Sequence, residues 1–140
     1  MINLDESIGT HINAAFIPEG NVCWIATANK AGEPDLGPKG SMMVFDDQSL
    51  AYWERTRRTT LQNLEENPNV VVVYRNAEER IQWRFHGVAT IHKDGPVREQ
   101  VMAKTIPQEL ERDPERKGIG VVIRVDKMMT FAGEILQQRD

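Results

Sequence analysis

Residues 55–60 read Arg-Thr-Arg-Arg-Thr-Thr and carry three guanidinium and three hydroxyl groups within six positions. Residues 50–53 before them are apolar and aromatic, which is typical of a β-strand, and residues 60–67 favour a helix that Pro68 would end. A helix start offers unpaired backbone N–H groups and the positive end of a dipole. Arginine and hydroxyl side chains at such a position predict a phosphate-binding site.

Arg58, Thr59 and Thr60 stand where that helix begins, so we expect them to form the phosphate site. An ordinary structural role is the alternative. Thr59 or Thr60 would then be the N-cap of the helix, worth about 1 kcal/mol, and the arginines would form a solvated face.

Residues 37–41, Gly-Pro-Lys-Gly-Ser, interrupt a predicted strand with two glycines and a proline. Such a pattern indicates a β-bulge or a place where a ligand approaches the backbone closely. Gly40 would leave backbone N–H and C=O groups open to a flat heteroaromatic ring, and Lys39 would put a positive charge beside a ring that becomes anionic on reduction. The alternative is a bulge with a surface lysine.

Residues 82–85, Gln-Trp-Arg-Phe, place Gln82 and Arg84 on one face of a predicted strand. A neutral amide beside an arginine can hydrogen-bond the carbonyl and imide groups of a ring. A barrel strand with one core face and one solvated face would show the same alternation, and the pattern does not separate the two interpretations.

Other chemistry is not supported. The three histidines, His11, His86 and His92, have no metal-ligand spacing with one another or with Cys23. No serine lies in a nucleophile-elbow context. We therefore predict no metal site and name no catalytic acid or base.

The composition is that of one globular domain spanning residues 1–140, with 40% hydrophobic and 27% charged residues. The net charge of −4 argues against nucleic acid or an anionic membrane as partner. No apolar run approaches the roughly 18 residues that span a bilayer. One cysteine allows no internal disulfide, and we expect a cytoplasmic protein.

Turn signals at even spacing separate about seven predicted strands, which favours a mainly β fold, a closed or half-closed antiparallel barrel with a few short helices. Strands are predicted at residues 21–28, 35–45, 50–53, 69–74, 80–92, 119–125 and 128–135, with a bend at Gly87. Helices are predicted at residues 4–16, ended by residues 18–20, at residues 60–67, and at residues 97–110 with an interruption at Pro107.

Together these segments resemble the pyridoxamine 5′-phosphate oxidase-like family of flavin mononucleotide (FMN)-binding split β-barrels, over roughly residues 22–135. The resemblance rests on the order and spacing of several motifs, at residues 24–28 and 32–34, 38–41, 60–64 and 67–68, and 93–96.

This resemblance implies a six- to seven-stranded antiparallel split β-barrel with a few short flanking helices, paired as a homodimer that holds FMN between its subunits. It implies an FMN-dependent oxidoreductase or electron carrier with a small-molecule substrate or redox donor. The alternative is a non-catalytic ligand-binding or sensory module on the same barrel, with haem, deazaflavin or another flavin.

The family's ligand roles carry over position by position. The resemblance puts Lys39, Gly40, Ser41 and Met42 along the flavin ring, Trp53 and Glu54 beside the ribityl chain, Arg58, Thr59 and Thr60 at the phosphate, and Gln82 against the ring from the partner subunit. Many relatives carry lysine where this chain has Thr59 or Thr60. The charge opposite the phosphate is therefore expected from Arg58 or its neighbouring arginines.

Overall fold

The computed structural model describes residues 1–16 and 21–140. It contains eight strands: β1 Cys23–Ala28, β2 Pro34–Lys39, β3 Met43–Asp46, β4 Ser49–Glu54, β5 Asn69–Asn76, β6 Ile81–His92, β7 Ile119–Thr130 and β8 Ile135–Gln138. Four helices accompany them: α1 Glu6–Asn13, α2 Thr59–Glu66, α3 Gly95–Lys104 and α4 Pro107–Leu110. The mainly β fold with short helices is confirmed, with eight strands in place of six to seven.

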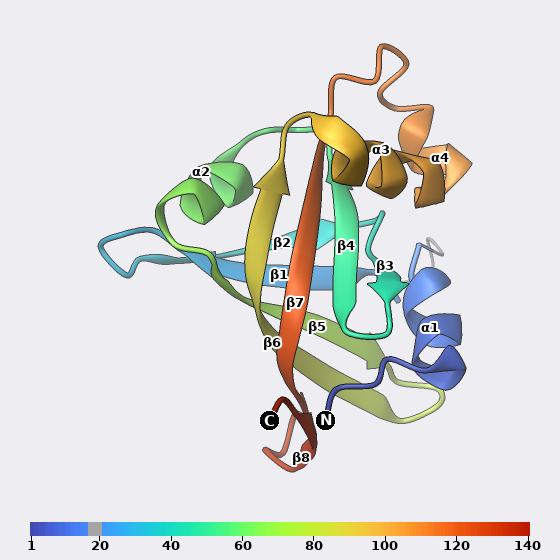
Figure 1. The fold of residues 1–140 in the computed structure, drawn as a ribbon. Helices are drawn as coiled ribbons and strands as arrows, with labels where there is room; N and C mark the ends of the chain where they lie inside the picture. Colours follow the sequence, from blue (N-terminus) through green and yellow to red (C-terminus); the bar gives the residue numbers. More distant parts are fainter. Residues whose placement is uncertain (17–20) are drawn as a thin grey trace.

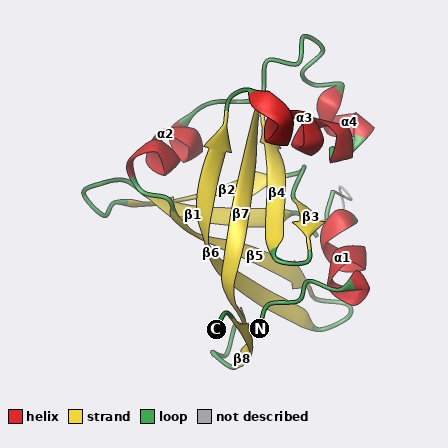
Figure 2. Cartoon of the chain, viewed as in Figure 1, coloured by secondary structure: helices red, strands yellow, loops and turns green. Residues whose placement is uncertain are grey.

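All eight strands belong to one antiparallel sheet that curls strongly (Figure 1). The order is β2-β1-β5-β6-β7-β4-β3, and β8 pairs with β7. The helices lie outside this sheet, with α2 on one side and α3 and α4 together at the end of β4 (Figure 2). The two ends of the strand order, β2 and β3, pair only on one side, which leaves the barrel split.

β4 is buried on both faces, and this explains its apolar and aromatic sequence. Leu50 and Tyr52 face the main core, where they join residues from α1, β1, β5, β6 and β7. Ala51 and Trp53 face the other way and pack with Val101 of α3 in a second core cluster. A strand held from both sides is a rigid support for whatever follows it in the chain.

The bend predicted at Gly87 is confirmed. The pairing of β6 with β7 shifts register between His86 and Gly87. A Cβ at Gly87 would collide with the backbone carbonyl of Arg124, so only glycine allows the two strands to approach this closely.

Two boundaries differ from the prediction, and the interruption predicted at Pro107 is confirmed. Residues 35–45 were predicted as one strand but form β2 and β3, because Gly40 and Ser41 make a turn in which the Met42 N–H reaches the Lys39 carbonyl at 3.4 Å. The strands predicted at residues 119–125 and 128–135 are wrong as divided, since β7 runs to Thr130. Pro107 begins a separate helix, α4, because proline has no N–H to continue α3.

The first helix is shorter than predicted, with Asp5 as its N-cap. Residues 18–20, predicted to end it, lie outside the described residues. In the part of the chain that the structure describes, no helix is long and apolar enough to cross a membrane.

Candidate cofactor site

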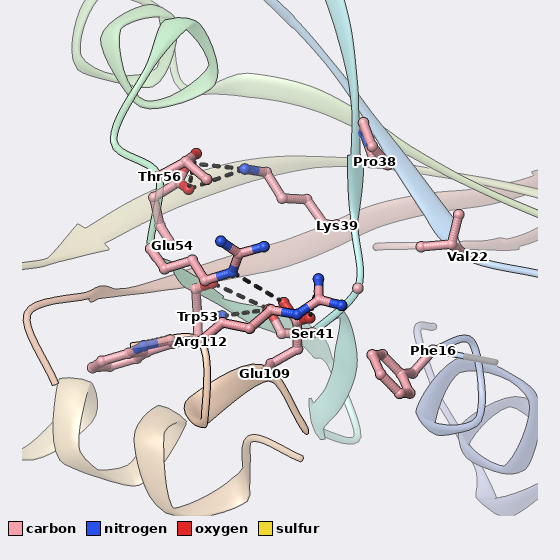
Figure 3. A pocket seen from close by; sticks show the side chains of 12 residues that line it. Phe16, Val22, Pro38, Lys39, Ser41, Trp53, Glu54, Thr56, Glu109 and Arg112 are labelled. Atoms are coloured by element: carbon pink, nitrogen blue, oxygen red, sulfur yellow. Dashed lines mark hydrogen bonds and ion pairs between the residues drawn. The ribbon is translucent and has the colours of Figure 1, made fainter. Parts of the chain in front are cut away.

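A cavity of about 340 Å³ lies where the ends of β2 and β4 meet α4 (Figure 3). Residues 38–41 and residues 53–56 form two of its walls, and Glu109 and Arg112 form the third. Phe16 and Val22 complete the lining. Five predicted cofactor-binding residues therefore come together here: Lys39, Gly40, Ser41, Trp53 and Glu54.

Ser41 fastens the turn after β2 to the end of β4. Its hydroxyl oxygen accepts a hydrogen bond from the Trp53 N–H at 3.0 Å and donates one to the Trp53 carbonyl at 3.2 Å. The pairing of β3 with β4 reaches only Ala51, so a side chain replaces the missing strand neighbour of Trp53. The backbone at the cavity is thereby held in place although its sheet pairing has ended.

Lys39 and Glu54 form a buried ion pair across the cavity wall. The Lys39 ammonium lies 3.1 Å and 3.0 Å from the two Glu54 carboxylate oxygens, and the side chains are 11% and 1% exposed. The Thr56 hydroxyl donates a longer bond of 3.4 Å to the same carboxylate. Within this chain, the positive charge expected at Lys39 is thus balanced by Glu54.

Tyr52 lies under this pair, with the Lys39 ammonium 5.3 Å from its ring centre. Burial, with a further contribution from the Glu54 charge, raises the pKa of the Tyr52 hydroxyl well above its ordinary value. The hydroxyl is buried without a hydrogen-bond partner among the described residues. Tyr52 therefore stays neutral, as an inner wall beneath the ion pair.

Glu109 and Arg112 were missed by sequence analysis. Glu109 is only 5% exposed, and its carboxylate lies against Gly40, where an added Cβ would stand 3.1 Å from its Oε2 atom. Arg55 and Arg112 each approach this carboxylate to 3.7 Å. No local pattern predicts this contact, because Glu109 belongs to a four-residue helix far along the chain.

The predicted phosphate segment begins α2 just beyond the cavity. Arg58 is the N-cap of α2 and makes no side-chain capping bond, so the alternative in which Thr59 or Thr60 caps the helix is wrong. Thr60 is buried beside Gly37 of β2, where a Cβ would meet its hydroxyl oxygen at 3.5 Å. β2 therefore contacts the start of α2 through Gly37 and lines the cavity through Pro38 and Lys39. Arg58, Thr59 and Thr60 are not among the residues lining the cavity.

Arg57 explains the shape of that connection. Its φ of 52° is in the left-handed region, and its guanidinium donates to the Lys117 carbonyl of the loop before β7. This leaves Arg58 as an exposed arginine directly at the helix start.

Met42 and Gln82 are not at the cavity. Met42 is buried and lines a neighbouring hollow with Ser41 and Met43. Gln82 is exposed at the start of β6. It pairs with Arg75 of β5 and is not among the residues lining the cavity.

The sequence matches the family model described as pyridoxamine 5′-phosphate oxidase over residues 11–126. An uncharacterised protein of Methanocaldococcus jannaschii, MJ0282, is 27% identical over 112 residues, which cover 79% of this chain and 72% of the relative. A solved structure from Lactobacillus delbrueckii, described as a candidate pyridoxamine 5′-phosphate oxidase, has a TM-score of 0.74 at 24% identity, covering 93% of this chain and 96% of that one.

Other solved structures with the same fold are described by different cofactors. An FMN-binding protein of Syntrophomonas wolfei has a TM-score of 0.67 at 10% identity, covering 98% of this chain and 91% of that one. HutZ of Vibrio cholerae, described as a heme storage protein, has a TM-score of 0.62 at 18% identity, covering 85% and 92%. These likenesses concern the fold. With the match of the family model to most of the chain, they show that this protein belongs to the pyridoxamine 5′-phosphate oxidase-like family of split β-barrels.

Proposed function

We propose that this protein binds FMN and acts as an oxidoreductase or electron carrier. The observation that carries the proposal is the cavity itself, which joins the Gly40 turn, the Lys39–Glu54 pair and, along β2, the start of α2. FMN, when bound, would supply the redox chemistry, and the protein would supply binding, charge and access.

The outer edge of β2 suits the flavin ring. β2 pairs only with β1, so its other edge carries backbone N–H and C=O groups without a strand neighbour. Gly40 adds no side chain of its own at the end of this edge, where the Glu109 carboxylate lies against it. A flat ring with several hydrogen-bonding groups would be held there mainly by backbone atoms.

The phosphate would lie at the start of α2. Its first N–H groups receive no bond from a capping side chain, and Arg58 is exposed beside them. Both features favour an anion. Thr59, the first residue of the helix, would add a hydroxyl donor.

The proposal includes a homodimer in the cytoplasm. A cavity of about 340 Å³ is at the low end of small-molecule sites, so one chain would cover only part of the cofactor. A second copy would cover the rest and supply Gln82, which is exposed and does not line its own cavity. The exposed apolar side chains of Trp24 on β1 and Leu36 on β2 suit such a contact.

Titration with FMN tests the proposal. The purified protein should take up FMN with quenched flavin fluorescence and a shifted absorbance spectrum, and the spectrum should bleach on reduction. Arg58→Ala should weaken FMN by about tenfold or more and leave riboflavin unchanged, because riboflavin has no phosphate. Arg124→Ala, which removes an exposed arginine of β7 outside the cavity, is the control. Failure to take up FMN would refute the proposal, and equal weakening of FMN and riboflavin would refute the phosphate assignment.

A non-catalytic module with another ligand is the second candidate, and the fold shared with HutZ, described as a heme storage protein, favours it. A protein described as an F420 reductase shares the fold as well, which makes a deazaflavin a further ligand to test. Parallel titrations with haem and with a deazaflavin separate it from the first. Stoichiometric haem binding with a Soret shift, and no binding of FMN, would favour this second function.

A further inference from the structure

Two arginines at the mouth of the cavity share a single carboxylate. Arg55 Nε lies 3.7 Å from Glu109 Oε1, and an Arg112 guanidinium nitrogen lies 3.7 Å from Glu109 Oε2. Charge-assisted N–H···O bonds measure about 2.7–2.9 Å, so these contacts are ion pairs without a hydrogen bond. Two positive charges against one negative charge leave one positive charge in excess at this end of the cavity.

These arginines differ from others nearby in how their donors are used. The guanidinium groups of Arg57, Arg98 and Arg116 donate to backbone carbonyls and thereby hold loops. Those of Arg55 and Arg112 make only the two ion pairs with Glu109 within the described ranges, residues 1–16 and 21–140. A guanidinium has five N–H donors, so most donors of this pair remain available at the cavity.

The other end of the cavity cannot attract an anion in the same way. There Lys39 is bound by both oxygens of Glu54 at 3.0–3.1 Å, which makes that end neutral. The charges along the cavity therefore direct an anionic group toward Arg55 and Arg112. Arg112 is 58% exposed and can turn toward an incoming molecule, whereas the buried carboxylate of Glu109 cannot leave easily.

We propose that Arg55 and Arg112 bind the carboxylate or phosphate group of a small anionic substrate. This inference rests on the proposed flavin-dependent function and names the charge class of its second reactant. Guanidinium forks match both kinds of oxyanion and bind them through two parallel hydrogen bonds. Glu109 holds the two guanidinium groups apart on either side and competes with the anion for them.

One other source has the same chemistry, namely the phosphate of FMN itself. In Figure 3 the helix α2 lies above the Lys39–Glu54 pair, whereas Glu109 and Arg112 lie below it, and none of Arg58, Thr59 and Thr60 lines the cavity. We therefore assign the two anion sites to different molecules. The experiment must distinguish them.

Calorimetric titration with inorganic phosphate and with acetate, at constant ionic strength in chloride, tests the site. Wild-type protein should bind at least one of these anions saturably. Arg112→Ala should weaken binding about tenfold, Arg112→Lys should restore part of it, and Glu109→Gln should tighten it several-fold by removing the competing charge. Lys93→Gln, an equal charge change at an exposed residue outside the cavity, should bind like wild type. Circular dichroism would verify that each variant is folded.

No saturable binding, or equal loss in Arg112→Ala and Lys93→Gln, would overturn the inference. FMN and riboflavin titrations of Arg112→Ala decide the source of the anion. Unchanged affinity for both supports a separate substrate, whereas a selective loss of FMN affinity would assign the site to the cofactor phosphate and overturn it. If wild-type protein binds the anion as expected but takes up no FMN, the flavin proposal fails and the anion site stands.

Discussion

Breaking the Lys39–Glu54 pair should destabilise the fold far more than removing both partners. At 3.0 Å and an effective dielectric constant of about 20, two unit charges attract by about 5.5 kcal/mol. Lys39→Met would leave the Glu54 carboxylate, which is 1% exposed, with only the 3.4 Å bond from Thr56. We expect a loss of about 3–5 kcal/mol in the free energy of unfolding.

The reverse change should cost less. Glu54→Leu leaves an ammonium that is 11% exposed and can reach water, so we expect a loss of about 2–3 kcal/mol in the free energy of unfolding. The double variant Lys39→Met/Glu54→Leu has no unpaired charge, and we expect its stability to lie near or above that of wild type. The coupling free energy between the two positions should therefore be about 5 kcal/mol or more.

Urea unfolding followed by tryptophan fluorescence measures these values, and a loss of 3–5 kcal/mol corresponds to roughly 12–20 °C in Tm. The matched control is the surface pair Lys93–Glu65, at 3.8 Å with side chains 62% and 47% exposed. A double-mutant cycle at this surface pair should give a coupling free energy of less than about 1 kcal/mol. A coupling free energy at Lys39–Glu54 no larger than in this control would refute the argument.

Three further changes follow from contacts around the site. Ser41→Ala removes both hydrogen bonds to the Trp53 backbone and should cost about 1–3 kcal/mol in urea unfolding, with Ser41→Thr as the milder control. Tyr52→Phe removes a buried hydroxyl without a partner and should be neutral or stabilising by up to about 1 kcal/mol; a loss above 1 kcal/mol would reveal a missed partner. Burial opposes ionisation of Asp113, but hydrogen bonds from the Lys117 and Gly118 N–H groups and the Trp53 indole outweigh it and lower its pKa. The stability that this ionised group contributes is therefore present above its unfolded pKa and is lost as pH falls through its folded pKa. In Asp113→Asn, the free energy of unfolding should therefore depend less on pH below about pH 4, and its dependence on pH near neutrality should be unchanged.

The sequence alone predicted where most of the strands and turns lie, but not how residues 35–45 and 119–138 divide into strands. Runs such as residues 69–74 are apolar and β-branched, and this preference acts locally, so β5 was predicted almost to its boundaries. Gly87 was predicted as a bend because a glycine inside a strand pattern often marks a bulge or a bend. The order of motifs then indicated the family and the β2 and β4 residues that line the cavity.

Only the tertiary structure decided which charges meet. Lys39 and Glu54 are 15 residues apart, and Trp53 bonds Asp113 across 60 residues, so no local periodicity could pair them. Glu109 contacts Gly40 because Pro107 starts a separate short helix that folds back over the end of β4. The sequence predicted Lys39 as a positive charge, whereas the fold neutralises it with Glu54 and leaves the excess charge at Arg55 and Arg112. Residue types fix the charges that a chain can offer, but long-range packing decides which of them remain unbalanced.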